Sequence, residues 1–418
     1  MNEKNLNEWL TYLEQLHPTE IELGLTRIGQ VADTLNLINF DAKVITVAGT
    51  NGKGTTCAFL EEILVQAGYK VGVYSSPHIQ RYTERLRINK QEMPEHLHCQ
   101  AFRQVEKARA GISLSYFEYV TLGCLSILKD QQCDFILLEV GLGGRLDATN
   151  VVESDVSVVT TIGIDHIDWL GDDREKIGFE KAGVFRALKP VVCGEIDVPQ
   201  SLINHAQTLE CDIRYANIDF TASVNDKGWS WAGKTTLSNL PLTLMPLQNA
   251  STALAVIEAL GLTLPETLLR KAIGEAKLAG RLQKVEMDAS IEIYLDVAHN
   301  PQSANYLASQ LKKLRKPDGK IFAIVGMLED KDIAGTFSVI NECIDHYHFI
   351  SLNCYRGASS QTLLSHYQSS EHAIAKVKCF DNIASAYSSV QEHLSDSDTI
   401  IVFGSFYTVS DFLTLSQG

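Results

Sequence analysis

The feature that most constrains the fold is a short stretch near the N-terminus that combines a strand, a glycine-rich turn and a helix. An apolar run, VITVA, leads into the turn GTNGKGTT, and the helical pattern CAFLEEILV follows it. Glycines allow the backbone to turn sharply and bring its N–H groups close to an anion, and a helix that begins there adds its positive end. Lys53 adds a point charge within the turn. The stretch therefore predicts a phosphate-binding loop.

The spacing of this loop differs from the common pattern G-x-x-x-x-G-K-[ST]. That pattern needs glycine at position 47, where this chain has Val47, and the chain instead reads G-x-x-G-K-G-T. A glycine-rich turn after a strand can also be simple punctuation. The combination of strand, lysine, hydroxyl and helix favours the phosphate loop. Its candidate nucleotide contacts are Gly49, Thr50, Asn51, Gly52, Lys53, Gly54, Thr55 and Thr56.

Strand and helix patterns alternate along most of the chain. From residue 43 to about 200, β-branched runs that end in Gly, Asp or Ser alternate with helical patterns, which is typical of a parallel sheet covered by helices. The stretches FTASV, WSWAG and LPLTLM indicate a small antiparallel addition, and a second α/β cycle begins near residue 291. A chain of 418 residues is too long for one ordinary core. We expect an α/β protein with a phosphate-loop domain over 1–280, a linker over 281–290 and a smaller Rossmann-like domain over 291–418.

Composition excludes several classes of function. The formal net charge of −15 and the lack of any lysine- or arginine-rich block argue against a nucleic-acid partner. No apolar run approaches the roughly 18 residues that a membrane span needs. The 9 cysteines are scattered and form no C-x-x-C pair, which suits free thiols in a reducing compartment. We therefore expect a cytoplasmic protein that binds small molecules.

Polar side chains stand at the ends of three further apolar runs. Ser76 ends VGVYSS, Glu139 ends FILLE, and Asp165 and His166 follow VSVVTTIGI. Ligands of doubly wound sheets collect beyond the carboxyl ends of the strands, so these groups are expected to converge near Lys53. Magnesium bound to nucleotide phosphates takes only one or two protein carboxylates, which suits this sparse set. Singly, Ser76 also reads as a capped strand end and His166 as a buried core histidine, whereas burying Glu139 without a cation or donor is costly.

Nine strings along the chain carry a resemblance to a known family. They occur in order up to about Thr408: GTNGKGTT, YSSPHIQRYTERLRI, SYFEYVTLG, LEVGLGGRLDATN, DHIDWLG, EKAGVF, LDVAHNP, GMLEDKD and GSFYTV. With these strings the chain resembles the bifunctional dihydrofolate synthase/folylpolyglutamate synthase family of the Mur ligase superfamily. The resemblance implies ATP-dependent ligation of L-glutamate, through an acyl phosphate, to dihydropteroate and to the γ-carboxylate of reduced folates.

The resemblance also implies roles for residues of the first domain. The phosphate loop would bind ATP, with Lys53 on the β- and γ-phosphates, and Ser76, Glu139 and His166 would hold Mg²⁺. Lys181, in EKAGVF, matches a lysine that carbon dioxide carbamylates in this superfamily. Without the resemblance, Lys181 reads as a solvated helix residue. Carbamylation would turn a cation that repels metal into an anion able to hold a second Mg²⁺.

Further matches concern the nucleotide and the second domain. Asn249 and Arg281 match nucleotide-contacting positions. Asp296, His299 and Lys331 resemble second-domain residues that close over ATP and help to place the reacting groups, including glutamate. A plain turn after a buried strand is the alternative interpretation of these three residues. Tyr407 departs from the family pattern, because close relatives often have histidine there.

The pterin site is implied by four matches: Ser115, Phe117, Asp147 and Ala148. An aromatic ring can stack on the planar pterin, and a carboxylate can accept a forked pair of N–H donors from its aminopyrimidine edge. Phe117 reads equally as plain core. Ser115 stands where the family pattern has threonine, a change that keeps the hydroxyl.

Three alternatives remain open. A monofunctional folylpolyglutamate synthase would share most of these residues. A Mur ligase that extends a nucleotide-linked muramyl peptide shares the phosphate loop and the acyl-phosphate chemistry, but the strings SYFEY and LDATN argue against it. An ATP-binding switch without ligation has no need of His166, Lys181 and a second-domain aspartate and histidine. For the ligase we expect a monomer.

Overall fold

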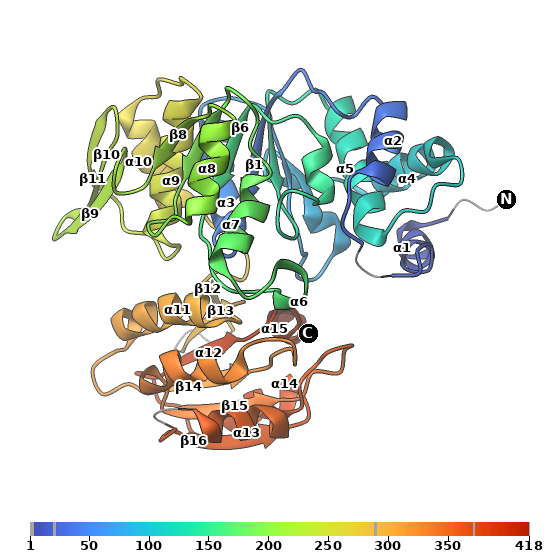
Figure 1. Ribbon diagram of the computed structural model, residues 1–418. Helices are drawn as coiled ribbons and strands as arrows, with labels where there is room; N and C mark the ends of the chain where they lie inside the picture. The colour runs from blue at the N-terminus through green and yellow to red at the C-terminus, as the bar shows by residue number, and fades with distance from the viewer. Residues whose placement is uncertain (1–3, 20–21, 288–290, 371–372, 418) are drawn as a thin grey trace. The chain divides into compact units, whose positions relative to one another are not determined.

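The computed structural model divides into two compact units, Met1–Ala276 and Lys277–Gly418 (Figure 1). The structure describes residues 4–19, 22–287, 291–370 and 373–417. Each unit has its own sheet covered by helices, so the predicted α/β class is confirmed. The stretch 281–290, which the sequence suggests as a linker, contains a short strand, and residues 288–290 of it lie outside the described residues.

The larger unit is built on an eight-stranded, mostly parallel sheet with the order β4-β3-β2-β5-β1-β6-β7-β8. The strand before the phosphate loop, β1, lies inside this sheet and pairs in parallel with β5 and β6. Only β3 and β4, at one edge, pair antiparallel. The strands are β1 (Lys43–Ala48), β2 (Val71–Tyr74), β3 (Leu86–Ile88), β4 (Gln91–Glu92), β5 (Phe135–Glu139), β6 (Val156–Val159), β7 (Pro190–Cys193) and β8 (Asp212–Tyr215).

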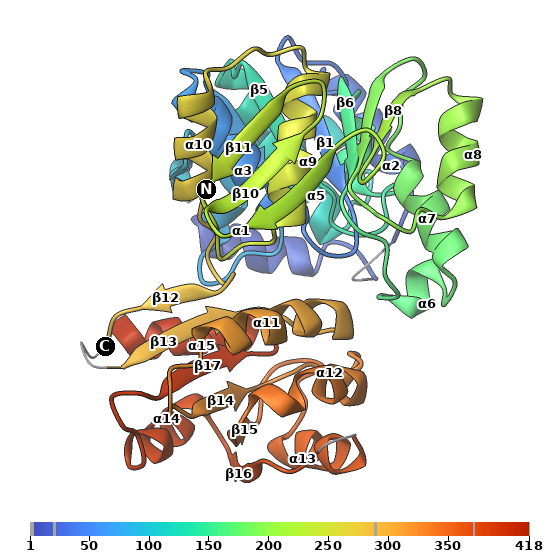
Figure 2. The same ribbon diagram turned by 90° about the vertical axis from the view of Figure 1, so that its left-hand side faces the viewer.

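Helices cover both faces of this sheet (Figures 1 and 2). One face packs on α1, α2, α4 and α5 through a core that includes Val44, Ile136 and Leu138. Helices α3, α9 and α10 pack together across the other face. The helices of the unit are α1 (Leu6–Glu14), α2 (Thr26–Thr34), α3 (Lys53–Gln66), α4 (Glu95–Arg109), α5 (Tyr116–Asp130), α6 (Ile167–Leu170), α7 (Arg174–Ala182), α8 (Gln200–Thr208), α9 (Leu247–Ala259) and α10 (Glu266–Glu275), with the short 3-10 helices η1 (Tyr82–Arg85) and η2 (Ala148–Val151).

The predicted antiparallel addition is a three-stranded sheet that packs against α9 and α10 (Figure 2). Its strands are β9 (Thr221–Asn225), β10 (Gly228–Ala232) and β11 (Thr236–Leu240). The third strand ends at Leu240, the first residue of LPLTLM, so the prediction of a strand along the rest of that run is wrong. The side chains of Trp229 and Trp231 are fully buried, so both rings lie on the inward face of β10.

The smaller unit has a six-stranded sheet with the order β12-β13-β17-β14-β15-β16, parallel except for β12. Helices α11, α12 and α13 share one apolar core on this sheet. The strands are β12 (Gln283–Val285), β13 (Glu292–Asp296), β14 (Ile321–Val325), β15 (His346–Ile350), β16 (Lys376–Phe380) and β17 (Thr399–Phe403). The helices are α11 (Pro301–Leu314), α12 (Ile333–Ile340), η3 (Asn341–Cys343), α13 (Ser360–Ser369), α14 (Ile383–Gln391) and α15 (Phe406–Gln417).

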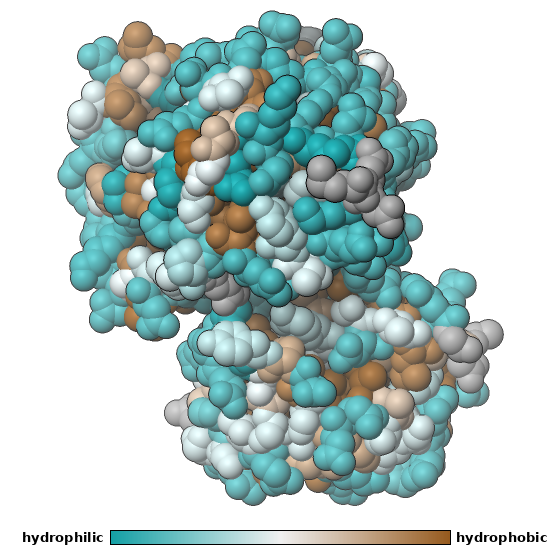
Figure 3. Space-filling model, turned by 90° about the vertical axis from the view of Figure 1, so that its right-hand side faces the viewer, coloured by the Kyte–Doolittle hydropathy of each residue, from teal (hydrophilic) through white to brown (hydrophobic). Residues whose placement is uncertain are grey.

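The surface is mainly polar on the face drawn in Figure 3, where hydrophilic residues predominate on the larger unit. Across the described residues, no helix combines the length and the apolar character that crossing a membrane requires. The apolar side chains lie largely in the cores described above.

Candidate functional site

Two glycines of the phosphate loop adopt backbone conformations that other residues rarely reach. Gly49 and Gly52 have φ angles of +151° and +87°. A Cβ atom at Gly49 would collide with the Thr160 side chain, and one at Gly52 would lie 2.6 Å from the amide oxygen of Asn249. The loop can therefore turn tightly against its neighbours only because both positions are glycine.

Lys53 fastens the loop as well as carrying its charge. Its Nζ donates hydrogen bonds to the carbonyl oxygens of Gly49, at 2.9 Å, and of Thr50, at 3.2 Å. The sequence alone suggested only a phosphate contact for this lysine. The structure adds a second role, because the ammonium group closes the loop upon itself.

The N-terminus of α3 offers hydrogen-bond donors to an anion. No side chain caps this helix, which begins at Lys53 directly after Gly52. Thr55 donates to the Gly52 carbonyl at 3.0 Å and accepts from Asn249 of α9 at 2.5 Å. The buried Thr56 hydroxyl has no hydrogen-bond partner among the described residues. An uncapped helix start beside an unpaired hydroxyl supplies what a phosphate group requires, so these residues fit a nucleotide.

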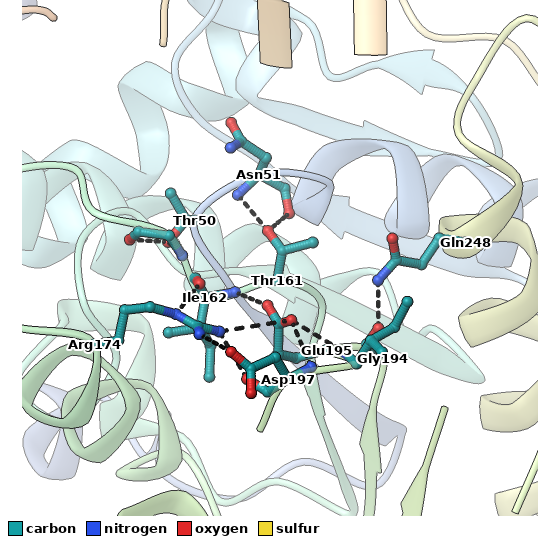
Figure 4. A network of polar contacts seen from close by, with 11 residues as sticks. Thr50, Asn51, Thr161, Ile162, Arg174, Gly194, Glu195, Asp197 and Gln248 are labelled. Atoms are coloured by element: carbon teal, nitrogen blue, oxygen red, sulfur yellow. Dashed lines mark hydrogen bonds and ion pairs between the residues drawn. The ribbon is translucent and has the colours of Figure 1, made fainter. Parts of the chain in front are cut away.

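Residues that follow β6 hold the loop from behind (Figure 4). The Thr50 amide donates to the Thr161 carbonyl at 2.8 Å, and the Asn51 amide donates to the Thr161 hydroxyl at 3.0 Å. The Thr160 hydroxyl donates to the Asn51 carbonyl at 2.6 Å, and the Thr50 hydroxyl donates to the Gly163 carbonyl at 2.9 Å. The end of β6 therefore fixes the middle of the loop.

Glu139 is buried at the end of β5, next to the base of the loop. Its backbone is in register with Val47 of β1, two residues before Gly49. Burial raises the pKa of the Cys57 thiol in α3, and the negative charge of Glu139 raises it further. A buried carboxylate beside the strand that leads into a phosphate loop fits a divalent cation bound together with phosphates.

Lys181 is buried near the same charges. It lies at the end of α7 and is 2% exposed, so its interpretation as a solvated helix residue is wrong. Burial lowers the pKa of Lys181 to about 7, the positive charge of Lys53 lowers it further, and Asp165 opposes the shift. The three charged groups therefore share one electrostatic neighbourhood. Near neutral pH a substantial fraction of the Lys181 side chain is the uncharged amine.

His166 and Ser76 are more accessible than Glu139. His166 is exposed and has a φ angle of +53°, and its amide donates to the Asp165 carboxylate at 2.8 Å. The alternative of a buried core histidine is therefore wrong. Within the described ranges, no three or more His, Cys, Asp or Glu residues form a group that could hold a metal. A cation bound by Glu139 and His166 would need the half-buried Ser76 hydroxyl, phosphate oxygens and water to complete its coordination.

The predicted pterin residues Phe117 and Asp147 meet at Gly141. A Cβ atom at Gly141 would lie 2.6 Å from the tip of the Phe117 ring and 3.1 Å from a carboxylate oxygen of Asp147. The Phe117 ring also stacks on Tyr74, with 6.3 Å between the ring centroids and 29° between the planes. Phe117 is half-buried and packs against the apolar core of this unit, so part of its side chain remains exposed.

Asp147 already has a local structural role. Its carboxylate accepts from the Leu142 amide at 2.9 Å, the Thr149 amide at 3.0 Å and the Thr149 hydroxyl at 2.6 Å. It caps η2, which begins at the buried Ala148. Burial raises the pKa of Asp147, and these hydrogen bonds lower it. A pterin edge would therefore share this carboxylate with three protein donors.

Ser115 also has a structural partner. It caps α5 by accepting a hydrogen bond from the Glu118 amide at 3.3 Å, and the Glu118 carboxylate accepts from the Ser115 amide at 2.7 Å. Either serine or threonine supplies this capping hydroxyl, so the departure from the family pattern preserves the start of the helix.

In the smaller unit, Asp296, Arg281 and His299 lie close together. The Asp296 carboxylate accepts from two backbone amides, at 2.9 and 2.8 Å. Burial raises the pKa of Asp296, and the charges of Arg281 and His299 oppose the shift. His299 Nδ1 lies 2.8 Å from the Val297 carbonyl, which can only accept, so this ring nitrogen carries the proton.

The remaining predicted residues of the smaller unit differ in exposure. The Lys331 side chain is 9% exposed, and its Nζ lies 4.0 Å from the Asp330 carboxylate. Tyr407 is 51% exposed. Beside it in the chain, the Phe406 ring centroid lies 5.6 Å from the Arg281 guanidinium.

Sequence reasoning missed the pair Glu195 and Arg174, which lies behind the loop (Figure 4). Glu195 follows the run PVVCG, so it is a strand-end carboxylate of the same kind as Glu139. The rule that drew attention to Glu139 could have found it. Arg174 gives no comparable signal, because a single arginine in a polar helical stretch does not indicate its tertiary partner.

Comparisons with known proteins identify the family. The Mur ligase middle domain matches residues 47–260, and the Mur ligase, glutamate ligase domain matches residues 280–406. The dihydrofolate synthase/folylpolyglutamate synthase of Escherichia coli (strain K12) is 48% identical over 97% of this chain and 94% of its own length. The chain belongs to the dihydrofolate synthase/folylpolyglutamate synthase family. The resemblance inferred from the nine strings is confirmed.

Solved structures of dihydrofolate synthase/folylpolyglutamate synthases have the same fold. Escherichia coli FolC in complex with DHPP and ADP gives a TM-score of 0.94 at 46% identity and covers 99% of this chain and 98% of that chain. A bifunctional folylpolyglutamate synthase/dihydrofolate synthase with Mn, AMPPNP and L-glutamate bound gives 0.91 at 46% identity, with 99% and 98% covered. Both relatives bind an adenine nucleotide, and the second also binds a divalent metal and glutamate.

Proposed function

We propose that this chain ligates L-glutamate, with hydrolysis of ATP, to dihydropteroate and to the γ-carboxylate of reduced folates. The observation that carries the proposal is the 48% identity to a bifunctional enzyme over almost the full length of both chains. The phosphate loop, with an uncapped helix start and the Lys53 charge, supports the use of ATP. The chain would thus act twice in folate synthesis, making dihydrofolate and then folylpolyglutamates.

The residues around the loop divide the work of the first step. Lys53 and the amides at the start of α3 offset negative charge as the substrate carboxylate attacks the γ-phosphate to give an acyl phosphate. Glu139, His166 and Ser76 would hold Mg²⁺, which supplies further positive charge at the phosphates. Asn249 orients Thr55 through their 2.5 Å hydrogen bond and so keeps the loop shaped for the nucleotide.

Lys181 supports a second metal position in this proposal. Its buried amine lies near Lys53. Because its pKa is lowered to about 7, a substantial fraction of the amine is uncharged near neutral pH, and the uncharged form reacts with carbon dioxide. The resulting carbamate would be an anion in place of a cation, which suits a second Mg²⁺. No other lysine of α7 is buried, since Lys176 is exposed.

In the second step the amine of glutamate attacks the acyl phosphate, and inorganic phosphate leaves. For the smaller unit we propose a share in nucleotide and glutamate binding through Arg281, Asp296, His299 and Lys331. The cluster of Asp296 with Arg281 and His299 supports this role, because buried, mutually interacting charges are typical of functional sites. We propose that the enzyme works as a cytoplasmic monomer, which light scattering on the purified chain would test.

One assay tests the reaction. ADP release is measured with dihydropteroate or with tetrahydrofolate, each with and without glutamate. Release that requires glutamate with both substrates is the expected result. Activity with tetrahydrofolate alone would indicate a monofunctional folylpolyglutamate synthase, activity with a muramyl peptide would indicate a peptidoglycan ligase, and glutamate-independent turnover would indicate an ATP-binding switch.

Phe117→Ala is expected to impair dihydropteroate ligation more than glutamate addition to tetrahydrofolate. The ring lies beside Asp147, where it can stack on the pterin, and loss of such stacking costs about 1 kcal/mol, or roughly fivefold in kcat/KM. The longer glutamyl tail of tetrahydrofolate must place its pterin elsewhere if its terminal carboxylate is to reach the same phosphate. The ratio of the two kcat/KM values checks this expectation.

The control for Phe117 is the second reaction of the same variant, which reports any general damage to the fold or the ATP site. Asp147→Ala should shift the ratio in the same direction, with an additional loss of thermal stability because η2 loses its cap. Equal losses in both reactions would mean one shared pterin site, and the proposal of two pterin positions would be dropped.

A further inference from the structure

A buried carboxylate lies one layer behind the phosphate loop (Figure 4). Glu195 follows β7 and is 9% exposed. Its Oε2 accepts from the Ile162 amide at 2.6 Å, and its Oε1 accepts from the Ile196 amide at 3.0 Å and the Asp197 amide at 3.1 Å. Arg174 completes the group, with its Nη2 3.7 Å from Glu195 Oε1. The carboxylate thus joins the backbone after β6 to the backbone after β7.

Arg174 binds the same two backbone segments, after β6 and after β7, through their carbonyl groups. Its Nε donates to the Ile162 carbonyl at 3.1 Å, and its Nη2 donates to the Asp197 carbonyl at 2.7 Å. Its Nη1 also contacts the Asp197 carboxylate. Glu195 and Arg174 together therefore hold both the N–H and the C=O group of Ile162.

Ile162 directly follows Thr161, the residue that accepts hydrogen bonds from the phosphate loop. The Thr161 carbonyl and hydroxyl receive the amides of Thr50 and Asn51. The loop cannot hold its own shape by side-chain packing, because it turns at Gly49 and Gly52 and glycine gives the backbone more freedom than any other residue. Its shape therefore depends on hydrogen bonds, both those of Lys53 within the loop and those that Thr161 accepts from it.

We propose that Glu195 and Arg174 are positioning residues that fix the phosphate loop in its nucleotide-binding geometry through Ile162 and Thr161. Both residues bind the backbone of Ile162 and would act on the loop through it. The inference rests on the proposed nucleotide role of the loop and adds a second layer to it. Arg174 also begins α7, the helix whose last turn contains Lys181, so the same pair links the loop to the element that carries the candidate carbamate.

Glu195→Gln tests the inference, because an amide keeps only one acceptor oxygen. In either orientation its NH₂ group faces a backbone N–H that the carboxylate now accepts. The dissociation constant of ADP, measured by calorimetry on the full chain, is expected to rise on the order of tenfold because a buried amide loses its partner. KM for ATP should rise by a similar factor, with a smaller change in kcat.

Glu175→Gln is the matched control. Glu175 lies on α7 next to Arg174, and its carboxylate, like that of Glu195, accepts from two neighbouring backbone amides, those of Gln200 at 3.0 Å and Ser201 at 2.7 Å. Among the described residues, Glu175 makes no hydrogen bond to the phosphate loop or to Ile162. This variant should keep the ADP affinity of the wild type, even where its melting temperature falls as far as that of Glu195→Gln.

Arg174→Met provides a second variant, since the arginine side chain is 34% exposed and its removal leaves the three backbone bonds of Glu195 in place. We expect a weakening of ADP binding of roughly threefold. If Glu195→Gln does not fold, the ADP affinity of Arg174→Met, compared with that of Glu175→Gln, tests the positioning role. Unchanged ADP affinity in folded variants, or equal weakening in Glu175→Gln, would overturn the positioning role. A wild-type chain that fails to bind ADP would instead overturn the nucleotide role of the loop, and this inference with it.

Discussion

Lys53→Ala is expected to abolish both ligations, with a loss on the order of 3 kcal/mol or more in transition-state stabilisation, or at least about 100-fold in kcat. The lysine carries the only positive side-chain charge within the loop Gly49–Thr56. Its Nζ also donates to the carbonyl oxygens of Gly49 and Thr50, so the variant loses both charge and loop closure. Glutamate-dependent ADP release with dihydropteroate and with tetrahydrofolate measures the loss.

Lys43→Ala is the matched control for this variant. Lys43 starts β1 at the opposite end of the same strand, its side chain is 62% exposed, and it pairs with Asp155 at 3.3 Å. An exposed ion pair contributes little, so this control should be close to wild type in both activity and melting temperature. A Lys53→Ala protein that melts cooperatively and still turns over at a near-normal rate would remove the loop from the catalytic site.

The phosphate loop could be predicted because its signals are local. Glycine positions, one lysine and the change from strand to helix all lie within about twenty residues, and each has a direct conformational meaning. The structure agrees at Gly49 and Gly52, whose φ angles are positive. The burial of Glu139 could be predicted for a related reason. It stands in an apolar strand, where a carboxylate must meet a cation or a donor.

The burial of Lys181 could not be predicted from local pattern. A lysine near the end of a polar helix reads as solvated, whereas in the fold the segment around Gly144 packs closely against the end of α7. A Cβ atom at Gly144 would lie 2.7 Å from the Glu180 carbonyl, which shows how closely the two backbones approach. The resemblance to a family points to Lys181, and the fold explains how burial lowers the pKa of its amine.

The strand register of the antiparallel addition was also beyond local pattern. LPLTLM alternates apolar and polar residues as a strand does, but β11 is formed by Thr236–Leu240. Trp229 of the neighbouring strand pairs with Leu240 and Trp231 pairs with Leu237, with a shift in register between them that no local pattern indicates. The Glu195–Arg174 pair is a similar case, since the arginine acquires its role only when α7 packs beside the end of β7.

Lys181→Ala is expected to lower both ligations by roughly 100-fold or more, because a metal-holding anion contributes several kcal/mol to charge stabilisation. If Lys181 acts as a carbamate, a small carboxylic acid should restore part of the activity by occupying the vacated position. Lys176→Ala is the matched control, since Lys176 lies on the same helix but is exposed. It should be fully active and insensitive to the added acid.

The carbamate also predicts a pH dependence with a definite sign. Only the uncharged amine reacts with carbon dioxide, and the pKa of Lys181 is lowered to about 7, so the reactive fraction rises as the pH increases through 7. Enzyme depleted of bicarbonate should therefore regain more activity on bicarbonate addition at pH 8 than at pH 6. An ordinary exposed lysine, with a pKa near 10.4, would remain almost fully protonated at both values. A crystal with metal and nucleotide bound that shows an unmodified, well-ordered Lys181 amine, together with bicarbonate-independent activity at both pH values, would exclude the carbamate.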